Sequence, residues 1–316
     1  MTQRMFAAAL AACFVLSTGG AALAGGKTGT AAIKGKVTME GEAPKPKAVN
    51  MKADAFCASH KPQPEPGSVV FAKDGNTIPY VFVYVKEGIT EKYDAPAEPV
   101  TIDQHNCMYS PHVFGMVAGQ SIKIVNSDET AHNIHAMPKK NGEFNFGQPK
   151  KGMTAMREGK DTFNKPEQMV QIKCDVHPWM SAYVGVLEHP FFDVSKFEPK
   201  EARGTFEIKN LPAGEYELEA WHERFGKLTQ KVAVKDGETK EIEFKFSKGA
   251  AMAPAAGGDV RLVSLESKTD GSSCCAKKAA AECEAKKAGS CCSKRGEATV
   301  DGASKDSAGA KALAGR

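Results

Sequence analysis

Short stretches of apolar residues predict β-strands over most of the chain. Apolar and polar positions alternate around Ile33 and Val37, and segments 78–85, 168–174 and 181–190 are apolar and rich in Val, Ile or Tyr. Turns containing Gly, Pro and Asn separate such segments, and no sustained 3.6-residue period occurs before the C-terminal tail. This pattern is typical of a β-sandwich or barrel, so the sequence predicts an all-β fold class.

A second alternating run lies further along the chain. Phe206, Ile208 and Tyr216 alternate with polar residues, and the turn NLPAG (210–214) joins two strands. From residue 250 onward Ala, Lys, Gly and Ser dominate. A segment with so few large apolar side chains cannot offset the entropy cost of ordering, so we expect a disordered tail.

The N-terminal segment has the features of an export signal. Arg4 precedes an apolar run, and Ala22–Ala24 offers a small-residue cleavage site. The polar stretch 17–20 interrupts the run before it is long enough to span a bilayer. Residues 10–13 resemble a lipobox that would anchor Cys13, but the apolar run continues past this cysteine. We therefore expect cleavage, a periplasmic or secreted protein, and no membrane span.

The charge distribution excludes nucleic acid as a partner. The formal net charge is +4, and the basic excess lies mainly in the lysine-rich tail, which leaves the preceding part nearly neutral. The tail also carries closely spaced cysteines that either bind soft metal ions or oxidise and cross-link. They are Cys274, Cys275, Cys283, Cys291 and Cys292.

Three cysteines lie between the signal segment and the tail. In an oxidising compartment two of them are expected to pair, and the third needs a reason to stay free. A disulfide between Cys57 and Cys107 is the simplest arrangement, and it leaves Cys174 unpaired. A second metal site is the alternative. It would combine the first two cysteines with nearby histidines, namely His60, His105 and His112.

The loop CDVHPWM (174–180) places a thiol, an imidazole and a thioether between two predicted strands. A tight turn brings Cys174 and His177 together, and a further imidazole can come from His132 or His135. Asn133 is a candidate to hydrogen-bond across the site. Soft and borderline donors in this mixture suit copper that cycles between Cu(I) and Cu(II).

Other roles for these residues have to be weighed. A lone Cys174 or Met180 is usually core material. A structural zinc site is a more specific alternative. Its four donors would be Cys174, His132, His135 and His177.

These two segments resemble the cupredoxins, and among them the amicyanins. Amicyanins carry an H-N-V-H segment and a C-x-x-H-P-[aromatic]-M loop, which match residues 132–135 and 174–180. The resemblance spans roughly 68–189 and implies a Greek-key sandwich with one type-1 copper ion, although the 137–165 connection is longer than in small cupredoxins. His135 matches a histidine that is not a ligand there. The implied copper ligands are His132, Cys174, His177 and Met180.

The segment after residue 200 resembles the carboxypeptidase regulatory-like domains, which are small prealbumin-like sandwiches. Their pattern G-x-F-x-[IL]-x-x-L-P-x-G-x-Y matches residues 204–216. A first strand of the type G-x-V is missing there but occurs at Gly35–Val37. We therefore expect residues 31–49 to complete this second sandwich, with the copper-type sandwich inserted between.

Together these patterns predict five parts of the chain. They are a signal peptide (1–24), an N-terminal strand and Pro-rich linker (25–66), a cupredoxin-like copper domain (67–190), a carboxypeptidase regulatory-like sandwich (200–247) and a disordered tail (248–316).

The expected function is one-electron transfer without catalysis, because a site with two His, one Cys and one Met leaves no open coordination position. Redox proteins such as a dehydrogenase or a cytochrome are the expected partners, docked on an apolar patch around His177. Copper storage or delivery is the main alternative, and a surface-interaction module with a structural copper ion is a third. The predicted patch comprises Pro178, Trp179, Met137 and Pro138.

Overall fold

A computed structural model describes residues 26–247 of the 316-residue chain. The predicted signal peptide (1–24), Cys13 and the tail from residue 248, with its five cysteines, lie outside the described residues. Within the described range no helix is long and apolar enough to cross a membrane. The helices are short: α1 (Ala55–Ser59), η1 (Pro66–Ser68), η2 (Ala72–Asp74), η3 (Gly159–Asp161) and η4 (Lys200–Ala202).

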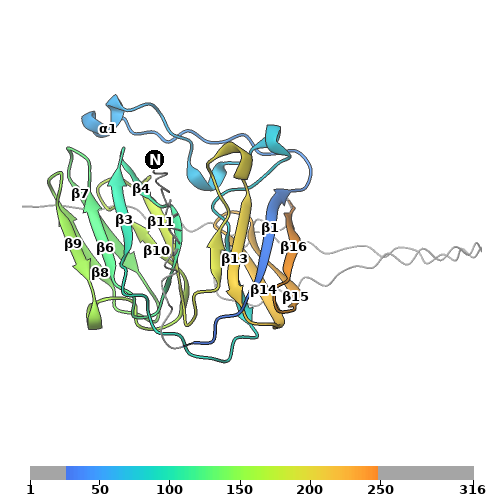
Figure 1. The fold of residues 1–316 in the computed structure, drawn as a ribbon. Coiled ribbons are helices and arrows are strands. Elements are labelled where there is room, and N and C mark those ends of the chain that lie inside the picture. Colours follow the sequence, from blue (N-terminus) through green and yellow to red (C-terminus); the bar gives the residue numbers. More distant parts are fainter. Residues whose placement is uncertain (1–25, 248–316) are drawn as a thin grey trace, which may run out of the picture. The chain divides into compact units, whose positions relative to one another are not determined.

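The all-β prediction is confirmed, and the strands form two sandwiches (Figure 1). We call one the inserted sandwich. Its strands are β3 (Val100–His105), β4 (Met108–Ser110), β5 (Val113–Val117), β6 (Ile122–Asn126), β7 (His132–Met137), β8 (Phe144–Gln148), β9 (Thr154–Arg157), β10 (Glu167–Lys173) and β11 (Ser181–Leu187). A sheet in the order β5-β11-β10-β7-β8 shares one apolar core with a sheet in the order β4-β3-β6-β9.

We call the other one the flanking sandwich. Its strands are β1 (Ala31–Met39), β2 (Phe82–Glu87), β12 (Phe192–Val194), β13 (Thr205–Leu211), β14 (Gly214–His222), β15 (Gly226–Val234) and β16 (Thr239–Phe246). The sheets β13-β1-β16 and β12-β2-β14-β15 enclose a second apolar core.

Strand β1 lies in the middle of a sheet whose other two strands, β13 and β16, come late in the chain. Gly35 pairs with Phe206 of β13, and Val37 pairs with Phe244 of β16. Strands of the flanking sandwich thus stand both before and after the nine consecutive strands of the other sandwich. The inserted sandwich is therefore an insertion in the sequence of the flanking one.

Strand β2 departs from the expected boundaries, because residues 67–190 do not all belong to the copper-type sandwich. It pairs with β14 and β12 of the flanking sandwich. Its apolar run is buried on both faces, with Val83 and Val85 in the flanking core and Phe82 and Tyr84 in a separate apolar cluster. Because all these positions are apolar, the sequence pattern does not indicate which sheet the strand joins. The inserted sandwich accordingly begins at Val100.

Two glycines allow the aromatic rings of the cluster formed by Phe82, Tyr84 and Phe192 to pack closely on strands of the inserted sandwich. We call this group of rings the aromatic cluster. A methyl group on Gly115 of β5 would lie 2.3 Å from the Phe192 ring, and one on Gly185 of β11 would lie 2.4 Å from the Phe82 ring. These distances are shorter than any real carbon contact, so the packing of rings on backbone requires glycine at both positions.

Candidate metal centre

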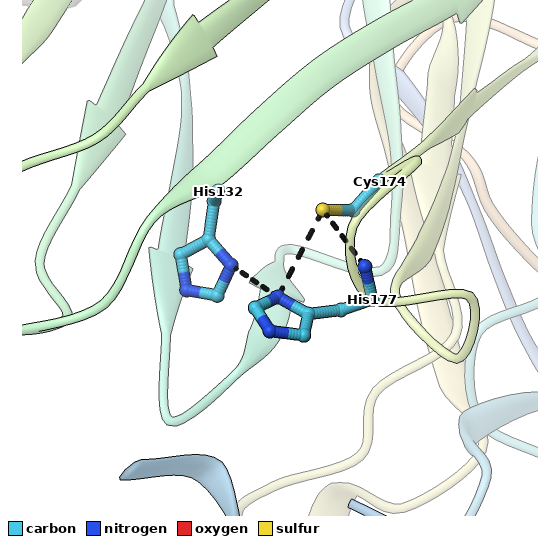
Figure 2. Close-up of side chains that lie close together, drawn as sticks. All are labelled: His132, Cys174 and His177. Atoms are coloured by element: carbon cyan, nitrogen blue, oxygen red, sulfur yellow. Dashed lines mark hydrogen bonds between the residues drawn. The ribbon is translucent and has the colours of Figure 1, made fainter. Parts of the chain in front are cut away.

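Three predicted donors converge at one end of the inserted sandwich (Figure 2). The Nδ1 atoms of His132 and His177 lie 2.9 Å apart, and Cys174 Sγ lies 3.9 Å from His177 Nδ1. All three residues are buried. A metal ion about 2.0–2.3 Å from each atom can contact all three, because protein ligands bind transition ions at such distances.

The strand pairing explains this convergence. Strand β10 is hydrogen-bonded to both β7 and β11, with Lys173 opposite His135 and also opposite Ser181. Cys174 directly follows β10, so it lies at the end of the sheet where β7 starts. His132 is the first residue of β7, and the loop 174–180 carries His177 back towards β11.

Backbone hydrogen bonds close this loop. The Cys174 N–H donates to the Met180 carbonyl (3.1 Å), and the Met180 N–H donates to the His177 carbonyl (2.9 Å). The His177 N–H points at Cys174 Sγ, 3.3 Å away. Met180 is fully buried and belongs to the same core cluster as Cys174.

Asn133 connects β7 to the loop. Its Oδ1 accepts the N–H of Asp175 (2.6 Å) and the longer bond from Val176 (3.4 Å), and it lies 3.2 Å from Cys174 Sγ. Its Nδ2 donates to Asn145. This side chain therefore links β7, which carries His132, to the loop that carries Cys174 and His177.

His135 lies away from the three donors. Its Nδ1 is 3.0 Å from an Asp175 carboxylate oxygen, and its Nε2 is 2.8 Å from Glu143. The resemblance to amicyanins gave this histidine no ligand role. The four-donor zinc site is not assembled, because His135 does not join the cluster of the other three.

Cys57 and Cys107 form a disulfide bond, and Cys174 is the free cysteine of the part of the chain that the structure describes. The alternative second metal site from these two cysteines and three histidines does not form. His112 instead contacts Ser181 and Glu223, His60 packs against Phe56, and His105 is exposed.

The pKa values of Cys174 and His132 are shifted in opposite directions. Burial raises the pKa of the Cys174 thiol, but hydrogen bonds from His132, His177 and the backbone lower it to about 6. Burial lowers the pKa of His132, but hydrogen bonds to Asp128 and Cys174 raise it to about 9. The thiolate, which is the metal-binding form of cysteine, is therefore favoured at neutral pH.

Two aspartates at this site were not predicted from the sequence. Asp128 Oδ2 lies 2.9 Å from His132 Nε2, and Asp54 Oδ2 lies 3.4 Å from His177 Nε2. Asp128 precedes His132 by four residues, which is a signal that could have been used. Asp54 is far away in sequence, and no local pattern connects it to the loop.

The predicted docking patch needs correction, because the His177 edge is closed. His177 is only 2% exposed, and Cys57 Sγ lies 3.9 Å from its Nε2. Trp179 is partly buried, packs on the His177 ring and donates its Nε1–H to the Cys107 carbonyl.

Met137 and Pro138 do not reach this edge. Met137 lies at the other end of β7 from His132 and pairs with Gln171. Met137 is five positions further along the strand than His132, which corresponds to about 16 Å at roughly 3.3 Å per residue. Pro178 and Val176 are the exposed apolar residues of the ligand loop itself, and Val176 is 56% exposed.

Comparison with known proteins gives partial, weak matches to copper proteins. No family model matches the chain, and no curated protein is similar to it. A copper-containing nitrite reductase from Thermus scotoductus is 24% identical over 32% of this chain and 25% of its own, with a TM-score of 0.25. The Cu(I) form of the M51A mutant of amicyanin is 21% identical over 30% of this chain and 98% of its own, with a TM-score of 0.24.

A purple cupredoxin from Nitrosopumilus maritimus is 21% identical over 28% of this chain and 98% of its own, with a TM-score of 0.22. The chain thus spans about a quarter of the nitrite reductase. Two imidazoles and one thiolate, with a thioether nearby in sequence, are the donor set of blue-copper sites.

Proposed function

We propose that this protein binds one type-1 copper ion and carries single electrons between redox partners. His132, Cys174 and His177 would hold the ion as its three strong ligands, and Met180 would supply a weaker thioether donor. The observation that carries the proposal is the convergence of two Nδ1 atoms and one free sulfur in a buried cluster. Copper would supply the redox chemistry by cycling between Cu(I) and Cu(II), which two imidazoles and a thiolate can both hold.

The surroundings of the ligands favour electron transfer over catalysis. His132 lies at a strand end, and His177 lies in a loop closed by backbone hydrogen bonds. This scaffold would hold the donors in one geometry while copper changes its oxidation state. Both imidazoles and the sulfur are buried. A catalytic metal needs a coordination position open to substrate. We therefore propose a carrier that is not an enzyme.

The partners we propose are redox proteins, a dehydrogenase or a cytochrome, met in the periplasm or outside the cell. An oxidising compartment agrees with the disulfide between Cys57 and Cys107. Because His177 is covered, we place the docking contact on the exposed apolar part of the ligand loop, at Val176 and Pro178.

The test is a copper titration of the full chain followed by redox cycling. A carrier should bind one tightly held copper ion per protein chain. This ion should be reduced and reoxidised reversibly by one electron without leaving the protein. A storage or delivery protein should instead take up several Cu(I) ions and release them readily to a chelator. Uptake of several labile ions would overturn the carrier proposal.

A further inference from the structure

Both histidine ligands are contacted by a carboxylate on the side that faces away from Cys174. His132 Nε2 lies 2.9 Å from Asp128, and His177 Nε2 lies 3.4 Å from Asp54. The Nδ1 atoms of the two rings face each other and the sulfur. Each ring is therefore contacted at both nitrogens, with the inner nitrogen left for the metal.

Each aspartate is held in place by the backbone or by a hydroxyl. Asp54 accepts the Cys57 N–H (2.8 Å) as the N-cap of α1 and accepts the Thr130 hydroxyl (3.0 Å). Asp128 accepts the N–H groups of Asn106 and Cys107, both at 2.8 Å. These contacts leave neither carboxylate free to turn away from its imidazole.

The Cys57–Cys107 disulfide covalently joins the two segments that position Asp54 and Asp128. Cys57 follows Asp54 by three residues, and Cys107 is the residue whose N–H binds Asp128. Both half-cystines are fully buried, and the disulfide lies against His177. The segment that carries Asp54 lies outside all four sheets, and the disulfide links it covalently to the inserted sandwich beside the site.

We propose that Asp54 and Asp128, linked through the Cys57–Cys107 disulfide, are positioning residues that hold the two histidine ligands from outside. The inference rests on the proposed copper site. A carboxylate that accepts the Nε2–H fixes the tautomer and the ring orientation in which Nδ1 can bind metal. Loss of such a partner typically costs about 10–100-fold in metal affinity.

The experiment measures Cu(II) affinity, visible absorption and electron paramagnetic resonance spectra, and reduction potential for the full-length chain. We expect Asp54→Ala and Asp128→Ala each to weaken copper binding by about 10–100-fold and to change the spectra and the potential. Asp54→Asn keeps an oxygen acceptor and should retain more affinity than Asp54→Ala. The double variant Cys57→Ser/Cys107→Ser should resemble Asp54→Ala, since it frees the segment that carries Asp54.

Asp161→Ala is the matched control, because Asp161 is exposed on η3 and its side chain makes no contact with the site. The proposal is overturned if the wild type binds copper and the Asp54 and Asp128 variants match this control in affinity, spectra and potential. If Asp128→Ala fails to fold, Asp54→Ala decides, since its segment lies outside the sheets. A wild type that binds no copper refutes the proposed function itself, which is a different outcome.

Discussion

Asn133 shows how one side chain outside the ligand set organises the site. Its Oδ1 accepts the first two N–H groups that follow Cys174 and lies beside the sulfur. Without it these groups lose their partner at the point where the loop leaves β10. The residue thus acts on both the loop conformation and the surroundings of the thiolate.

We expect Asn133→Ala to lower the free energy of unfolding by about 1–3 kcal/mol, because it removes two hydrogen bonds worth about 0.5–1.5 kcal/mol each. Urea unfolding of the metal-free chain measures this. Asn145→Ala is the control, because Asn145 contacts only the side chains of Asn133 and Asp175. A loss no larger than the control's would show that the loop does not depend on Asn133.

At the scale of elements, the rings of Phe192 and Phe82 pack closely on the backbones of β5 and β11 because these strands carry glycine at the contact points. Gly185→Ala would push a methyl group into the Phe82 ring. We expect a loss of about 1–3 kcal/mol of stability, as for other overpacked cores. Gly147→Ala on β8 is the matched control, since a methyl group there has no atom within 4 Å. Equal thermal unfolding of the two variants would contradict the packing described for the aromatic cluster.

The sequence predicts the strands beside the metal-binding loop but not the sheet that β2 joins or the tertiary contacts that cover His177. The strands on both sides of the loop 174–180 follow from their apolar residues, and the donor spacing pointed to His132, Cys174 and His177. Strand β2 was assigned to the wrong sandwich because its apolar run is buried on both faces. The closed His177 edge depends on Cys57 and Asp54, whose approach is a tertiary contact without a local signal.

At the scale of the whole molecule, β1 joins the first described residues to the last strands of the flanking sandwich. Strand β1 lies between β13 and β16, with Ala31, Ile33 and Val37 fully buried, while Lys34 and Lys36 are exposed. An inserted sandwich of nine strands separates these partners in sequence. The flanking sandwich therefore depends on a strand that precedes the metal site.

We expect Val37→Asp to destabilise the flanking sandwich by about 3–5 kcal/mol, because it buries a carboxylate without a partner. Lys36→Asp introduces the same side chain at an adjacent, exposed position of β1 and should have a much smaller effect. Circular dichroism during thermal unfolding measures both. Equal unfolding temperatures would mean that β1 is not a core strand of this sandwich.

The most direct measurement for the whole account is the visible spectrum of the copper-loaded full chain beside that of Cys174→Ser. A thiolate bound to Cu(II) gives an intense charge-transfer band, so the wild type should be strongly coloured and the variant should lose this band. A wild type that takes up zinc but stays colourless with copper, or a band that survives in Cys174→Ser, would contradict the proposed copper site.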